Sequence, residues 1–150
     1  MTFKTLVGVG HEIKTAIQGS GSIAGELKSF VTTKRRKSLP LNVTYVSVGA
    51  SLDGAHWLRI AGGAGGQSRI VGMIDPATNT IGLSSSGVSL ARVYLDDRIL
   101  DLSKPVNLKV GGVVRPQGVV APSLTAVLES WRSREDEGLV YSAFVEIDPR

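Results

Sequence analysis

Val106-Asn107-Leu108-Lys109-Val110-Gly111-Gly112 decides the fold class of this 150-residue chain. Apolar and polar residues alternate up to Val110, which is the two-residue period of a strand with one buried face. The glycine pair that follows fits a tight two-residue hairpin turn, because both glycines can adopt the positive φ that such a turn requires. We therefore expect an antiparallel hairpin here and look for the same pattern elsewhere.

Short strand-like segments recur on both sides of this hairpin, spaced by about ten residues. They are residues 41–45, 56–60, 69–74, 80–83, 88–95 and 139–147. Turn residues separate several of them, including Asp75-Pro76-Ala77-Thr78-Asn79 and the glycine-rich residues 62–66, which we interpret as a hairpin connection. Many short strands at this spacing predict a β-sandwich-like module or a partly closed barrel.

Two segments have helical periodicity instead. The first has apolar residues on one face and ends near Lys37, before Pro40; the second follows Pro122 and Ser123. The apolar residues of these two segments are Ile23, Leu27, Phe30 and Val31 in the first, and Leu124, Val127, Leu128 and Trp131 in the second. We expect Trp131 to anchor the second helix on the sheet and Gly138 to end that helix. The fold class is thus mainly β with two helices.

Composition excludes several functional classes. The chain has no cysteine, which excludes a disulfide scaffold, a thiol nucleophile and a cysteine zinc site. It has no run of ~20 apolar residues, so we expect no membrane span. The net charge is +4, but the basic run at residues 34–37 fits a solvated helix end, and few aromatic residues accompany it. We expect no nucleic-acid binding; salt-dependent binding through that run is the weaker alternative.

No metal or cofactor site is expected. Asp96, Asp97 and Asp101 cluster without the spacing of a calcium loop, so turn formation is the favoured interpretation. The glycine-rich segment that begins at Ala61 lacks the Lys-Ser/Thr ending of a phosphate-binding loop, and a strand follows it.

The two histidines differ in context. His56 begins a strand-like segment and is expected to be structural. His11 follows an apolar segment and two glycines, and a helical pattern comes about a dozen residues later. A loop histidine between a strand and a helix is how a serine α/β-hydrolase presents its general base, although a His-Glu pair after a glycine is also common in other settings.

No nucleophile for His11 is found in the chain. The Gly-x-Ser-x-Gly elbow does not occur, and the nearest similar segment leads into a strand, so Ser89 is expected to be an ordinary strand residue. In triad order both the serine and the acid precede the histidine, which would put them upstream of Met1. We therefore expect the chain alone to be inert as a hydrolase.

A longer stretch carries a resemblance to a known family. Val93-Tyr94-Leu95-Asp96-Asp97-Arg98-Ile99-Leu100-Asp101-Leu102-Ser103-Lys104-Pro105-Val106 resembles the C-terminal module of bacterial, planctomycete-type serine α/β-hydrolases, which include esterase, phospholipase/carboxylesterase-like and peptidase-like proteins. His56-Trp57-Leu58-Arg59-Ile60 is similar to the strand that opens that module, and residues 124–131 with 138–141 are similar to its late helix and closing strand. Gly111-Gly112 departs from the usual Asn-Gly.

The resemblance implies a fold, a domain division and a function. Residues 1–40 would be the strand-loop-helix end of an α/β-hydrolase domain with His11 as general base, and residues 41–150 a non-catalytic β-rich accessory module. The partner would be the upstream hydrolase domain of the same polypeptide, acting on esters or peptides. The alternative is a self-standing β module that binds a protein, carbohydrate or envelope partner.

Overall fold

The computed structural model describes residues 25, 28–29, 32–33, 39–48, 53–63 and 66–150. The chain divides into two units, Met1–Lys37 and Ser38–Arg150. In the first unit the described residues are helical, and the hydroxyls of Thr32 and Thr33 donate to the carbonyls of Lys28 and Ser29 at 2.8 and 2.6 Å. These residues fall inside the first helix that the sequence predicts. The strand expected before it lies outside the described residues.

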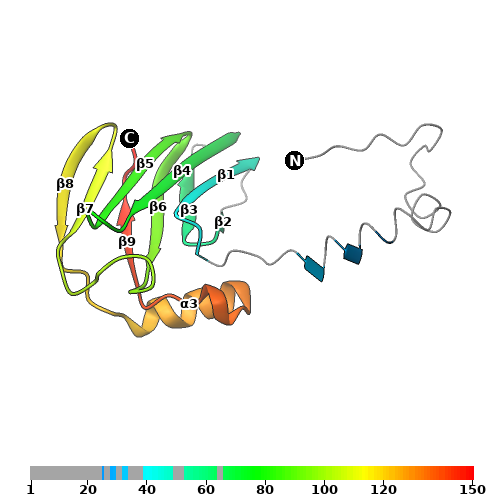
Figure 1. The fold of residues 1–150 in the computed structure, drawn as a ribbon. Helices are drawn as coiled ribbons and strands as arrows, with labels where there is room; N and C mark the ends of the chain where they lie inside the picture. Colours follow the sequence, from blue (N-terminus) through cyan, green and yellow to red (C-terminus); the bar gives the residue numbers. More distant parts are fainter. Residues whose placement is uncertain (1–24, 26–27, 30–31, 34–38, 49–52, 64–65) are drawn as a thin grey trace. The chain divides into compact units, whose positions relative to one another are not determined.

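The second unit contains nine strands, one α-helix and one 3₁₀ turn among its described residues (Figure 1). In chain order they are β1 (Asn42–Val48), β2 (Gly54–Ala55), β3 (Leu58–Gly63), β4 (Gln67–Asp75), β5 (Thr80–Ser86), β6 (Val88–Leu95), β7 (Val106–Val110), β8 (Val113–Gly118), α3 (Leu124–Arg134), η1 (Glu137–Leu139) and β9 (Ala143–Ile147). The prediction of a mainly β fold is confirmed.

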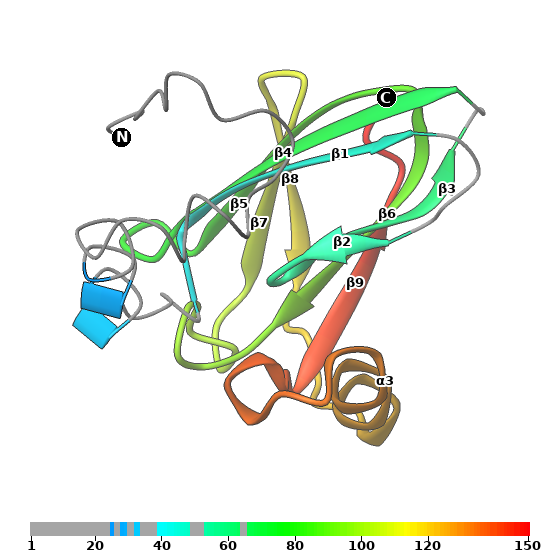
Figure 2. The same ribbon diagram turned by 90° about the vertical axis from the view of Figure 1, so that its right-hand side faces the viewer.

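The strands form two sheets (Figures 1 and 2). One has five strands in the order β1-β4-β5-β7-β8, and the other has four in the order β2-β3-β6-β9. All neighbours are antiparallel except β5 and β7, which pair in parallel. One hydrophobic cluster takes side chains from both sheets, including Ile70, Ile81, Leu58 and Val93. The described strands thus form a sandwich-like pair of sheets and not a closed barrel.

Burial alternates along the strands, as expected for a sheet with one buried face. In β4 the even-numbered residues from Ser68 to Ile74 are buried, while the odd-numbered ones are exposed or partly exposed. The turn at Gly111-Gly112 joins β7 to β8 with φ values of 57° and 85°, as expected for a two-residue hairpin. The sequence predicted a strand at residues 69–74 and a hairpin at Gly111-Gly112, and both are confirmed.

One predicted strand and one predicted connection are wrong. Residues 56–60 are not one strand: His56 and Trp57 form the turn between β2 and β3, and His56 has a φ of 52°. The glycine-rich segment is not a hairpin connection, because it joins β3 of the four-stranded sheet to β4 of the five-stranded sheet. Alternation of apolar and polar residues alone could not distinguish a hairpin from a link between two sheets, since it does not say which sheet a strand joins.

Candidate functional site

The strongest catalytic candidate of the sequence lies outside the described residues. His11 and the basic run at residues 34–37 both belong to the part of the first unit that the structure does not describe. The general-base assignment of His11 therefore stays a prediction. Ser89 lies within β6, as expected for an ordinary strand residue.

The aspartates near residue 100 stabilise turns. The carboxylate of Asp96 accepts from the backbone N–H of Arg98 at 3.0 Å, and that of Asp97 accepts from Leu102 at 3.1 Å. Asp101 accepts from the N–H of Ser103 at 3.1 Å and pairs with Lys104 at 2.6 Å. Among the described residues there is no group of three or more His, Cys, Asp or Glu side chains that could hold a metal ion. The turn interpretation is confirmed.

Helix α3 lies along one end of the two-sheet module (Figures 1 and 2). The side chains that it exposes overturn a prediction. Leu124, Leu128 and Trp131 are 73%, 57% and 45% exposed, so they face solvent. The buried face consists of Ala126 and Ser130. Trp131 therefore does not anchor the helix on the sheet.

Polar contacts fix this orientation. The buried hydroxyl of Ser130 donates to the carbonyl of Ala126 at 2.7 Å and accepts from the backbone N–H of Tyr141 at 3.1 Å. An unsatisfied buried N–H is costly, so the sheet side of α3 is chosen by Ser130 and not by the larger apolar residues. The helix ends at Arg134 with Glu135 in the left-handed conformation, at a φ of 48°, and not at Gly138, which belongs to η1.

A row of charged residues crosses the four-stranded sheet beside α3. Arg59 of β3 lies directly opposite Arg92 of β6, and Arg92 lies directly opposite Glu146 of β9. Three different strands thus bring these side chains to one side of the sheet. Like charges placed directly opposite on neighbouring strands repel, so the pair of arginines needs a compensating charge.

Arg92 receives that compensation from two glutamates. Its guanidinium donates to Glu146 at 2.6 and 3.2 Å and forms an ion pair with Glu129 of α3. It also lies over the ring of Phe144, 4.5 Å from the ring centroid. Partial burial lowers the pKa of Arg92, but Glu146, Tyr94 and Glu129 together outweigh it, so the pKa is raised above its usual value. Arg92 is therefore a fixed cation that ties α3 to the sheet.

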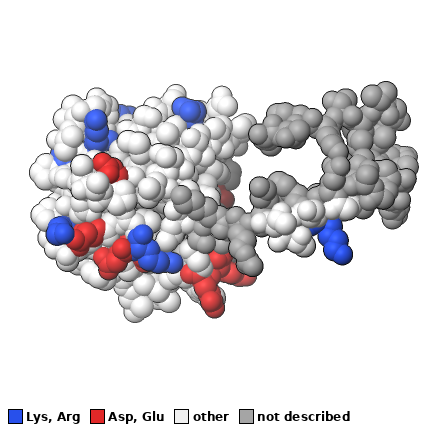
Figure 3. Space-filling model, in the orientation of Figure 1, with Lys and Arg blue, Asp and Glu red and all other residues white. Residues whose placement is uncertain are grey.

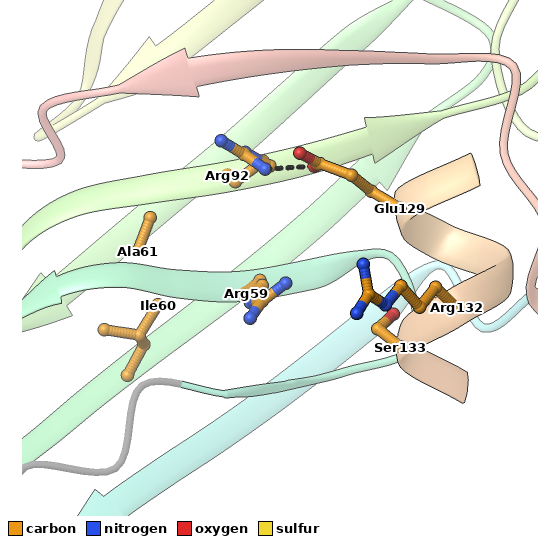
Figure 4. A pocket seen from close by; sticks show the side chains of 7 residues that line it. All are labelled: Arg59, Ile60, Ala61, Arg92, Glu129, Arg132 and Ser133. Atoms are coloured by element: carbon orange, nitrogen blue, oxygen red, sulfur yellow. Dashed lines mark hydrogen bonds and ion pairs between the residues drawn. The ribbon is translucent and has the colours of Figure 1, made fainter. Parts of the chain in front are cut away.

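Arg59 and Arg132 differ from Arg92 in this respect. Within the part of the chain that the structure describes, neither guanidinium forms a hydrogen bond or an ion pair with a protein acid. Both line a pocket of about 540 Å³ between the sheet and the last turns of α3, where Arg132 extends toward the strand that carries Arg59 (Figure 4). The other residues that line it are Ile60, Ala61, Arg92, Glu129 and Ser133.

The pocket is suited to an anion. Three guanidinium groups and one carboxylate line it, and that carboxylate, of Glu129, forms an ion pair with Arg92. Guanidinium groups present several N–H donors in one plane and recognise carboxylates and phosphates. On the face shown in Figure 3, by contrast, basic and acidic side chains are interspersed. Arg59 and Arg132, which no acid pairs among the described residues, therefore make this pocket a candidate anion site.

Sequence reasoning missed this pocket. Arg59 and Arg92 are far apart in the chain, and only the strand register makes them neighbours. Arg132 belongs to a helix whose buried face was predicted wrongly. The sequence signal that could have indicated the pocket is one arginine, Arg59 or Arg92, within each of two predicted strands.

No protein-family model, curated protein or solved structure matches this chain. Among the described residues no helix is long and apolar enough to cross a membrane.

Proposed function

We propose that residues 39–150 form a non-catalytic binding module that holds an anionic group of a partner molecule, a carboxylate or a phosphate, in the arginine-lined pocket. The proposal rests on two guanidinium groups, Arg59 and Arg132, that line one pocket and that no protein acid pairs among the described residues.

Electrostatics favours an occupied pocket. Arg59 lies opposite Arg92, and both glutamates near Arg92 already form ion pairs with Arg92. An anion between Arg59 and Arg132 would relieve the repulsion that the folded chain leaves there. The pocket is open to solvent, so the interaction is expected to weaken as salt is added.

The test is a titration of the chain with inorganic pyrophosphate and, separately, with citrate. We expect saturable binding, followed calorimetrically, that decreases with ionic strength and falls by roughly tenfold in Arg59→Gln and in Arg132→Gln. Arg69→Gln is the matched control, because Arg69 is an exposed arginine of β4 in the other sheet. Equal loss of binding in Arg69→Gln would show that only net charge matters and would reject the pocket.

The hydrolase assignment is a separate proposal that rests on the sequence resemblance. It makes the chain the C-terminal part of a serine α/β-hydrolase, with His11 as general base and the β module as an accessory to an upstream domain. The binding proposal is compatible with it, because the β module is non-catalytic in both.

A further inference from the structure

Three large apolar residues form a stripe on the outward face of α3. Leu124, Leu128 and Trp131 are spaced by four and three residues, so they lie on one side of the helix, and their exposed fractions are 73%, 57% and 45%. Single exposed apolar residues are ordinary on a protein surface. A helix that turns its apolar face to water and buries an alanine and a serine is not, because folding alone would favour the opposite arrangement.

The stripe cannot turn inward without breaking polar contacts. Burying Trp131 requires α3 to rotate by about half a turn about its axis. That rotation would remove Ser130 from the N–H of Tyr141 and Glu129 from Arg92. The helix is thus held with its apolar side out, and Leu, Trp and Arg side chains are presented together. Trp and Arg are the residue types that dominate binding energy at protein interfaces.

Charge decides which partner suits this surface. Arg132 follows Leu128 by four residues, so it borders the stripe, and it also lines the pocket with Arg59. On this helix Glu129 is already paired with Arg92. A second copy of α3 would bring its own unpaired Arg132 to the contact, whereas a partner with a carboxylate beside its apolar residues would complement it.

We infer that the outward face of α3 docks an acidic amphipathic segment of another protein, with apolar side chains on Leu124, Leu128 and Trp131 and a carboxylate in the pocket between Arg59 and Arg132. The carboxylate half of this inference rests on the anion binding proposed above; the apolar half does not. A helical segment is the natural partner, because side chains spaced at three and four residues match a stripe with the same spacing.

The probe is a phage library of random peptides about 16 residues long, enough for roughly four helical turns. The library is first depleted on the Leu128→Glu variant and then selected on the wild-type chain. We expect the surviving peptides to combine apolar residues at helical spacing with Asp or Glu. A synthetic copy should shift the fluorescence of the exposed Trp131, whereas the other tryptophan, Trp57, is fully buried.

Matched variants locate the contact. Binding of the selected peptide should fall by roughly tenfold or more in Leu128→Glu and in Arg132→Gln. Val114→Glu is the control and should bind normally, because Val114 is an equally exposed apolar residue, at 56% against 57% for Leu128, but belongs to β8. Circular dichroism and melting of each variant confirm that it is folded.

Each outcome decides the inference. No surviving peptide, or binding equally sensitive to Val114→Glu, overturns it. Self-association in sedimentation that Leu128→Glu abolishes would make a second copy the occupant and overturn it too. Peptide binding that needs Leu128 but not Arg132, with no pyrophosphate binding, rejects the carboxylate half and the proposed function together. Pyrophosphate binding without any peptide rejects this inference alone.

Discussion

The hydroxyl of Ser130 accepts a hydrogen bond from the backbone N–H of Tyr141, at 3.1 Å between two buried residues. Tyr141 lies between η1 and β9, so this contact joins α3 to the chain that enters the last strand. The same hydroxyl donates to the carbonyl of Ala126, one turn earlier in the helix. One small polar side chain therefore determines which side of α3 faces the sheet.

Replacing this hydroxyl should destabilise the module. Ser130→Ala leaves the N–H of Tyr141 buried without its acceptor, and the expected loss in the free energy of unfolding is about 1–3 kcal/mol. Ser133→Ala, an exposed serine of the same helix, should change it by less than about 0.5 kcal/mol. Urea denaturation followed by circular dichroism measures both. Equal stabilities for the two variants would mean that the contact does not hold the helix.

The two tryptophans should contribute very differently to stability. Trp57 is fully buried, and its indole N–H donates to the carbonyl of Pro40 at 2.6 Å. Trp57→Ala should therefore cost about 3–5 kcal/mol. Trp131 is 45% exposed, so Trp131→Ala should cost less than about 1 kcal/mol. Chemical denaturation measures both losses. A loss of about 3–5 kcal/mol in Trp131→Ala, as the apolar periodicity of the helix predicts, would contradict the exposed position of this residue.

Local sequence pattern predicted most of the β module. A strand at residues 69–74, the hairpin at Gly111-Gly112 and the existence of α3 follow from residue order alone. The sequence pattern gave a wrong prediction where the burial of a residue depends on a contact with a residue distant in the sequence. The buried face of α3 was assigned to its largest apolar residues, but Ser130 has a partner eleven residues away, at Tyr141, that periodicity does not reveal.

The candidate pocket is formed by residues that lie even farther apart in the sequence. Arg59, Arg92 and Arg132 come from β3, β6 and α3, and no short motif connects them. Their meeting requires the order of strands in the sheet and the position of the helix at its end. Nucleophiles, metal ligands and phosphate loops have local sequence signatures, whereas these three arginines have none.

A glycine of β4 is required by the packing of Trp57. A Cβ atom on Gly72 would lie 2.5 Å from the Trp57 ring, whereas one on Gly82 of β5 would meet nothing closer than 3.7 Å. Gly72→Ala should therefore lower the melting temperature clearly, and Gly82→Ala should leave it unchanged or raise it slightly. Differential scanning calorimetry compares them. A tolerated Gly72→Ala would show that the ring can shift at little cost.

The hydrolase proposal predicts that this chain is inert by itself. The chain has no Gly-x-Ser-x-Gly elbow, so no serine should be activated enough to react with a fluorophosphonate probe. Intact-mass spectrometry after incubation should show no adduct, with a known serine hydrolase labelled in parallel. An adduct on any serine of the native chain, lost on heat denaturation, would contradict this expectation.

The C-terminal end should show a measurable pH effect. The carboxylate of Asp148 accepts hydrogen bonds from the guanidinium of Arg150 at 2.6 and 2.8 Å, and these bonds lower its pKa from 3.8 to about 2. Because the pKa in the folded state is depressed, the stabilisation is present above pH 3.8 and is lost as the pH falls toward 2. An NMR titration of the Asp148 carboxyl carbon should therefore give a midpoint near 2. In Arg150→Gln the midpoint should rise toward 3.8, and in Arg69→Gln it should not move. A wild-type midpoint already near 3.8 would mean that the pair does not persist in solution.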